Sequence, residues 1–164
     1  MSFFTWELLT RLITSALGSC AFALIFKTDK RHLPMVSISG FVTYLVYHTV
    51  SFFGGGFFVA SFASTLFAAV FGEVCARVFR APTILYLVTG LIPIVPGGEA
   101  YYAMRYLLER NTAMASAKLL STGSVALGIA SGIVLVSIIV AAWADRKKQI
   151  HITGDTYGKY KKDI

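Results

Sequence analysis

The chain has 164 residues, of which 56% are hydrophobic and only 14% are charged, and its mean hydropathy is +0.70. A soluble protein has no use for so much apolar surface, so the composition excludes that class and indicates an all-α integral membrane protein. The net charge of +7 does not call for nucleic acid as a partner, because basic residues beside membrane spans face the anionic headgroups of the lipid bilayer.

Five charge-poor stretches are long enough to cross a bilayer, which takes about 20 residues each. The sequence therefore predicts a bundle of about five transmembrane helices in a domain over residues 1–143, followed by a basic, flexible cytoplasmic tail over residues 144–164. The predicted spans are Trp6–Phe26, Leu33–Phe53, Phe57–Val78, Thr83–Leu108 and Leu119–Trp143.

The basic residues in the connections orient these spans. The first connection holds Lys27, Lys30 and Arg31, whereas the second, around Gly54–Gly56, has no charge. Cytoplasmic loops retain lysine and arginine, so we expect the N-terminus outside and the C-terminus inside a bacterial cytoplasmic (inner) membrane.

Small residues recur at four-residue intervals on three of the spans. Helices in a bilayer associate by close packing of such residues, because lipid tails are as apolar as leucine. This pattern predicts a tight bundle in which the third and fifth spans are central. The small residues are Ser15, Ser19 and Ala23 in the first span, Ala60, Ser64, Ala68, Gly72 and Ala76 in the third, and Ser124, Gly128 and Gly132 in the fifth.

Ionisable side chains inside a span are costly and call for partners. Glu73 and Arg77 are four residues apart, so they share a helix face and are expected to form an ion pair near the cytoplasmic end. A structural pair and a coupling role in a transport path are equally compatible with this spacing. Arg11, one turn after Glu7, is expected to snorkel or to pair with that glutamate.

The fourth span is interrupted. Pro93 and Pro96 each remove a backbone donor, and Gly97 and Gly98 relax the steric limits on turning, so this helix is expected to stop and restart. Non-helical backbone at membrane depth is tolerated only where protein or a water-filled cavity surrounds it.

The N-terminus of the restarted helix is predicted to form a binding site for a carboxylate. Restarting after Pro96, at Gly97 or Gly98, this helix would present unpaired backbone amides at the positive end of the helix dipole. Glu99 could accept a substrate ammonium or carry a proton, and Tyr102 follows on the same side. Arg105 could bind a carboxylate with two hydrogen bonds. The alternative is that Glu99 stabilises the first turn, Arg105 pairs with Glu109, and the break caps a span.

The segment from Pro82 to Tyr102 resembles the Pro-x-x-Pro-Gly-Gly signature of the threonine/serine exporter family, with Ile94–Val95 as a mild departure between the prolines. Only Pro93, Pro96, Gly97 and Gly98 match as motif positions. The layout is similar to the small five-span subunit of the split, two-component type. The resemblance implies a larger membrane subunit as partner. It also implies export of small hydrophilic metabolites: threonine and serine in the fused single-chain form, and dicarboxylates such as succinate in some split forms.

The leading hypothesis is therefore a secondary-transporter subunit that contributes the broken helix to a shared path. Its energy source is expected to be an ion or proton gradient, because no nucleotide-binding loop is present. A non-transporting scaffold or assembly subunit, possible as a homo-oligomer, is the alternative class. No enzyme motif, metal site or cofactor is expected: Cys20 and Cys75 are isolated in sequence and lack metal-ligand spacing.

Overall fold

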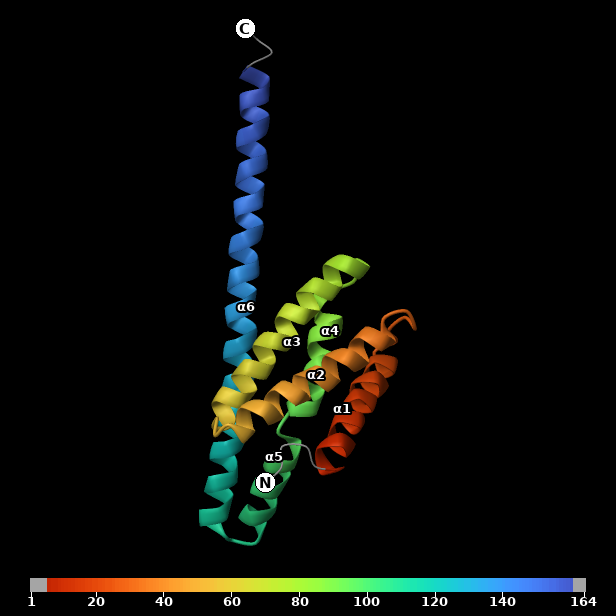
Figure 1. Ribbon diagram of the computed structural model, residues 1–164. Coiled ribbons are helices and arrows are strands. Elements are labelled where there is room, and N and C mark those ends of the chain that lie inside the picture. Colours follow the sequence, from red (N-terminus) through yellow and green to blue (C-terminus); the bar gives the residue numbers. More distant parts are fainter. Residues whose placement is uncertain (1–5, 161–164) are drawn as a thin grey trace.

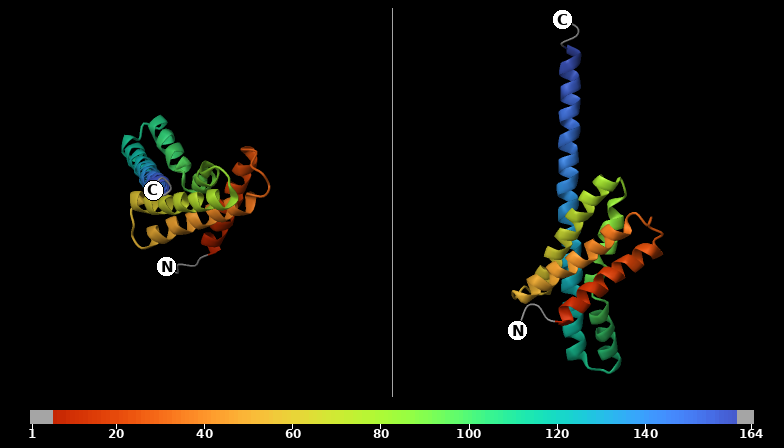
Figure 2. Two further views of the ribbon diagram at one scale, coloured as in Figure 1. Left: turned by 90° about the horizontal axis from the view of Figure 1, so that it is seen from above. Right: turned by 45° about the vertical axis from the view of Figure 1, so that its right-hand side comes forward.

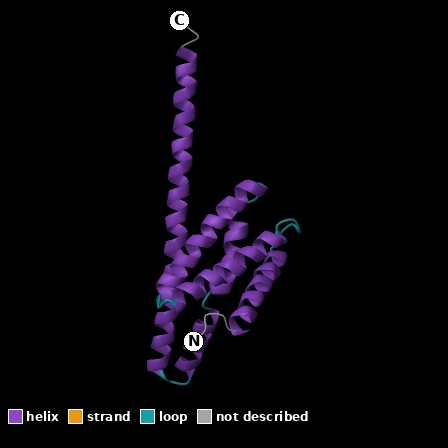
Figure 3. Ribbon diagram, in the orientation of Figure 1, coloured by secondary structure: helices purple, strands orange, loops and turns teal. Residues whose placement is uncertain are grey.

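A computed structural model describes the backbone of residues 6–160 and the side chains of residues 6–144. Within this part of the chain every regular element is helical (Figures 1 and 3), which confirms the predicted all-α fold class. The elements are α1 (Trp6–Ile25), α2 (Leu33–Phe52), α3 (Phe57–Phe79), α4 (Thr83–Leu91), a 3-10 helix η1 (Ile92–Ile94), α5 (Gly97–Leu108) and α6 (Thr112–Tyr160).

The number of membrane spans agrees with the prediction. Four helices, α1, α2, α3 and α6, are long and apolar enough to cross a bilayer, and α4 with η1 and α5 forms a fifth candidate that is bent by 48°. The bounds of α1, α2 and α3 lie within one residue of the predicted ones. Their apolar composition and short polar connections were sufficient to place them.

The fifth predicted span begins earlier than expected, at Thr112 rather than Leu119. Arg110 has a φ of 59°, in the left-handed region that ends a helix and turns the chain. The next residue then caps the new helix, because the Asn111 Oδ1 atom accepts the amide hydrogen of Met114 at 3.2 Å. A short turn thus joins α5 and α6 as an antiparallel hairpin.

The helix α6 is longer than a bilayer is thick. Its described apolar segment, Thr112–Ala144, has 33 residues, which is about 50 Å of helix against about 30 Å of hydrocarbon. Its backbone then continues as helix to Tyr160, so no break marks the predicted boundary between residues 143 and 144. The side chains of the predicted basic tail lie outside the described residues.

The helix α3 lies at the centre of the bundle, packed against α2, α4 and α6. By contrast, α6 packs on α3 and α5 at one side, while α1 packs on α2 and α4 at the other (Figure 2). The prediction of a central position is therefore right for the third span and wrong for the fifth. Exposed apolar side chains such as Leu120 and Leu127 leave a broad face of α6 to lipid or to another chain.

Glycines set the close approach of α6 to α3. A Cβ atom added at Gly128 would lie 2.7 Å from the carbonyl oxygen of Phe58, and one at Gly132 would lie 2.8 Å from the Cβ of Thr65. Both distances are too short for real side chains. The four-residue spacing in the fifth span is thus a packing surface, as predicted.

The same device joins α1, α2 and α4. The side chain of Ser19 fills the space beside Gly40, and the side chain of Ser39 fills the space beside Gly90. Both serines are fully buried. The helices on this side of the bundle are consequently in close contact at these two positions, and the cavity described below lies where they approach the helix break.

Candidate functional site at the helix break

The break in the fourth span is made by its prolines and by one extended residue. After α4, Pro93 is the second residue of the η1 turn, and Val95 then takes an extended conformation with ψ of 126°. Pro96 stands at the N-cap of α5, whose first backbone bond runs from the Ala100 amide to the Pro96 carbonyl at 3.1 Å. The expected stop and restart of the helix is confirmed.

The two glycines at the restart are not explained by the fold of this chain. Among the described glycines only Gly54 has a positive φ, so Gly97 and Gly98 adopt backbone angles open to any residue, and the expectation that they enable the turn is wrong. A Cβ atom at either position would meet no atom within 4 Å. Neither conformation nor internal packing requires glycine here, and the space beside both residues is open to another molecule.

The first turn of α5 is tied to α6 by charge. The Glu99 Oε2 atom lies 2.9 Å from the Lys118 Nζ atom and accepts a hydrogen bond from the Ser121 hydroxyl at 3.1 Å. Sequence reasoning missed both partners, because they lie beyond a turn that had not been placed. Pairing α5 and α6 as an antiparallel hairpin about Asn111 would have brought them opposite Glu99.

Farther along α5, the other predicted site residues have different surroundings. Arg105 pairs with Glu109 at 2.8 Å, as the structural alternative expected, and it does not join the cluster around Glu99. Tyr102 lies between Tyr101 and Tyr106, with ring centroids 5.5 Å and 6.5 Å away. The middle and the end of α5 thus carry a row of tyrosines and an exposed ion pair.

The hairpin of α5 and α6 projects beyond the rest of the bundle. Both views in which the bundle is seen from the side place α5 and the first turns of α6 past the turn between α2 and α3 (Figures 1 and 2). The break therefore lies where the packed bundle ends and the hairpin begins. This position explains how so many charged and tyrosine side chains fit into one predicted span.

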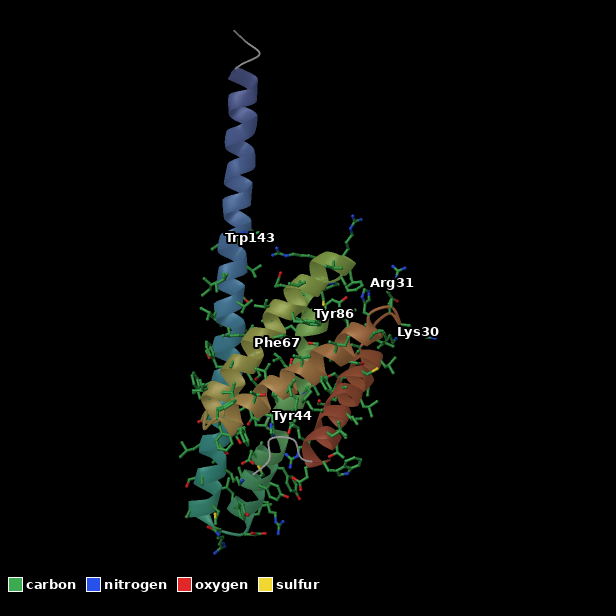
Figure 4. All side chains as sticks on the ribbon, in the orientation of Figure 1. Lys30, Arg31, Tyr44, Phe67, Tyr86 and Trp143 are labelled. Carbon is green, nitrogen blue, oxygen red and sulfur yellow. The ribbon has the colours of Figure 1, made fainter. Side chains whose placement is uncertain are left out.

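A cavity of about 300 Å³ lies beside the break, between α1 and α2. Arg11 lines it and hydrogen-bonds the side chain of Tyr44, which Figure 4 shows on α2 at the level of the break. Arg11 and Glu7 interact through their charges, as expected, but they form no salt bridge within the described residues. Sequence reasoning missed this site because its parts come from three separate helices.

The predicted pair of Glu73 and Arg77 is present, with the closest nitrogen and oxygen 3.5 Å apart. The Arg77 guanidinium also lies 4.7 Å from the centre of the Trp143 ring on α6; Figure 4 labels this tryptophan. These residues line an apolar groove of about 540 Å³ between α3 and α6. The cation therefore has two partners, of which the tryptophan was not foreseen.

Four or five apolar spans, one of them broken beside a cavity that Arg11 lines, define the chain as a multi-pass helical membrane protein. Residues 11–139 match the sequence model of the family described as Threonine/Serine exporter, ThrE. The chain therefore belongs to the threonine/serine exporter family, a family of transporters. No solved structure matches the chain.

Proposed function

We propose that this chain is the small subunit of a two-component secondary transporter that exports amino acids of the threonine and serine type. Its partner is a larger membrane subunit of the same family, and the two chains together form the transport path. The observation that carries this proposal is the open space beside Gly97 and Gly98, at the point where the broken helix restarts. A metabolite crossing the membrane needs such a place, where backbone amides are accessible.

The chemistry of the break suits the carboxylate of an amino acid. Pro96 has no backbone N–H, and the Gly97 amide donates to the Val95 carbonyl at 2.8 Å, so the amide proposed to meet the carboxylate, at the positive end of α5, is that of Gly98. Because neither glycine carries a side chain, an anion could approach this amide closely. Glu99 lies directly after Gly98 and is proposed to receive the substrate ammonium in exchange for Lys118.

Tyr102 and Arg105 are proposed to act later in the path, on the projecting part of α5. Both are exposed, so a larger partner or a substrate can reach them. Arg105 offers two parallel hydrogen bonds to a carboxylate when Glu109 is displaced. Tyrosine side chains present an apolar ring with a polar tip and suit the boundary between lipid and water.

The energy source is proposed to be an ion or proton gradient, with Glu73 and Arg77 as the coupling pair. The N-terminus lies outside and the C-terminus inside a bacterial inner membrane in this proposal. Lys30 and Arg31, which Figure 4 labels at the turn between α1 and α2, then face the cytoplasm.

The experiment is an efflux measurement with the two subunits expressed separately and together. Cells loaded with L-threonine should export it only when both chains are present, and the small chain purified alone should not transport in liposomes. Transport by the purified chain alone would exclude the two-component proposal. No efflux of any loaded metabolite by the assembled pair would exclude the transport proposal itself.

Dicarboxylates such as succinate are the second candidate substrate. Arg11 favours them, because this cation forms none of the salt bridges of the described residues and lies close to the break. Profiling of all metabolites exported by the complex, compared with a strain lacking both genes, distinguishes the two substrates. A scaffold without transport activity predicts an unchanged profile.

A further inference from the structure

We propose that the cavity between α1, α2 and the helix break is a second substrate position, in which Arg11 binds a carboxylate of the exported metabolite. This inference rests on the proposed function and adds a site that lies apart from the helix end at Gly97 and Gly98. The ligand class is a small carboxylate anion that also carries an ammonium or hydroxyl group, or a second carboxylate.

The cavity has the size and position of a small-molecule site. Its volume of about 300 Å³ lies at the lower end of the range for ligand pockets, which suits a metabolite of a few carbon atoms. Three segments that are far apart in the sequence meet there, and one of them is the break. The lining residues are Arg11, Thr14, Ser15 and Gly18 from α1, Tyr44 from α2, and Ile92 and Pro93 from η1.

The charge in the cavity is positive and forms no salt bridge. Arg11 takes part in none of the salt bridges of the described residues; its guanidinium donates a hydrogen bond to the Tyr44 hydroxyl oxygen, and the charge of Glu7 acts on it from farther away. A cation within a span that no carboxylate contacts directly is costly, and an anion bound beside it offsets that cost. A guanidinium with free donors is the group that binds carboxylates through two parallel hydrogen bonds.

The hydroxyl groups beside Arg11 complement the rest of an amino acid. Thr14 donates its hydrogen to the Thr10 and Arg11 carbonyls, at 2.9 Å and 3.0 Å, and Ser15 donates to the Leu12 carbonyl at 2.8 Å. The hydroxyl hydrogens of both residues are thus engaged, whereas lone pairs on both oxygens can still accept hydrogen bonds. Because these hydroxyls can act toward a ligand only as acceptors, they suit a substrate ammonium or hydroxyl group.

Glycine keeps the wall of the cavity open. Gly18 lies in the middle of α1, where glycine is unfavourable for a helix, and a Cβ atom there would meet no atom within 4 Å. Packing in this chain therefore does not require glycine at residue 18. At Gly40, by contrast, the side chain of Ser19 occupies the space that a Cβ atom would need. A side chain at residue 18 would instead enter the cavity and take the place of a ligand.

The first test measures transport by the assembled two-subunit complex in proteoliposomes. Arg11→Gln should raise the KM for L-threonine and succinate by about 10- to 100-fold, the effect of losing a charge-assisted hydrogen bond. Arg11→Lys should retain part of the affinity, because it keeps the charge and loses the second hydrogen bond. Arg31→Gln, an exposed cation in the turn after α1, is the matched control and should behave as the wild type.

The second test measures binding at the cavity directly. In a complex whose small subunit carries Cys20→Ala and Cys75→Ala, a cysteine introduced by Thr14→Cys should react with a water-soluble maleimide. L-threonine or succinate should slow this reaction at least tenfold, and adding Arg11→Gln should remove the protection. Gly18→Leu should block labelling while the complex stays assembled on size-exclusion chromatography.

Three outcomes separate this inference from the proposed function. If the wild-type complex exports metabolites while Arg11→Gln leaves both KM and protection unchanged, the inference is wrong and the proposed function stands. If phosphatidylglycerol vesicles slow the maleimide reaction and neither metabolite does, the inference is overturned, because the cavity then binds a lipid headgroup. If the wild type exports nothing, the proposed function fails, and protection by succinate still establishes an anion site at Arg11.

Discussion

The ammonium of Lys118 lies 2.9 Å from the carboxylate of Glu99 and joins α6 to the first turn of α5, directly after the helix break. The side chains of these residues are 36% and 35% exposed, so the pair is worth at most about 1 kcal/mol to stability. Its consequence is mainly geometric. It fixes the direction in which the restarted helix leaves the bundle.

Exchanging these two charges separates the geometric role of the pair from substrate binding. Glu99→Lys or Lys118→Glu alone places like charges opposite each other and should loosen the hairpin, whereas the double exchange should restore its thermal stability. Efflux should stay low in the double exchange, because the substrate ammonium no longer meets a carboxylate at residue 99. Full efflux by the double variant would show that Glu99 serves only to hold α5 against α6.

Alanine at the helix restart should have opposite effects on stability and on transport. Gly97→Ala and Gly98→Ala fit the backbone without strain and meet open space, so each should stabilise the isolated chain by about 0.4 to 1 kcal/mol. Efflux by the complex should nevertheless fall severalfold, because the new methyl group stands where substrate or partner approaches the amides. Thermal melting and efflux rate, measured on the same variants, check the stability and the transport predictions. Unchanged efflux would contradict a substrate or partner site beside Gly97 and Gly98.

Two glycines on the packing surface should differ sharply in their tolerance of alanine. A Cβ atom at Gly128 would lie 2.7 Å from the Phe58 carbonyl oxygen, whereas one at Gly72 would lie 3.4 Å from the Leu87 amide nitrogen, which is ordinary contact. Gly128→Ala should therefore destabilise the bundle by about 1 to 3 kcal/mol, and Gly72→Ala by much less. Melting temperatures in detergent measure the difference.

Comparison of Gly128→Ala with Gly97→Ala bears on the scaffold alternative. A scaffold would lose its activity in proportion to the loss of assembly, so Gly128→Ala would be the damaging change and Gly97→Ala a silent one. A transporter subunit loses efflux in both cases, for different reasons. Assembly measured by co-purification of the larger subunit distinguishes the two patterns.

The spans of the fold were predictable because each is set by local composition. Apolar runs of bilayer length placed α1, α2 and α3 to within one residue, and paired prolines located the break. The position of α6 was not predictable in this way, since its start depends on the capping by Asn111 and the turn at Arg110. The place of α6 at the edge of the bundle depends on which helices pack against it. The four-residue spacing of its small residues does not identify those helices.

Only the local part of the candidate site could be predicted from the sequence. Spacing of four residues correctly paired Glu73 with Arg77 and identified Glu109 as the alternative partner of Arg105. Contacts between distant segments were missed, including Lys118 with Glu99 and Tyr44 with Arg11. These contacts depend on how helices pack, and the sequence of a single chain carries no direct signal of it.

Neutralising Glu73 tests whether its pair with Arg77 couples transport to a gradient. The two side chains are 3.5 Å apart and partly exposed, and Arg77 keeps its contact with Trp143 when the carboxylate is removed. Glu73→Gln should therefore change stability by less than about 1 kcal/mol. Efflux driven by an imposed pH gradient should fall at least tenfold, while exchange of internal for external L-threonine continues, because exchange needs no net movement of protons. Glu109→Gln removes the carboxylate of a similar four-residue pair at the end of α5 and is the matched control for gradient dependence. Equal loss of driven efflux and exchange in Glu73→Gln would assign the pair to the transport path or to packing instead of coupling.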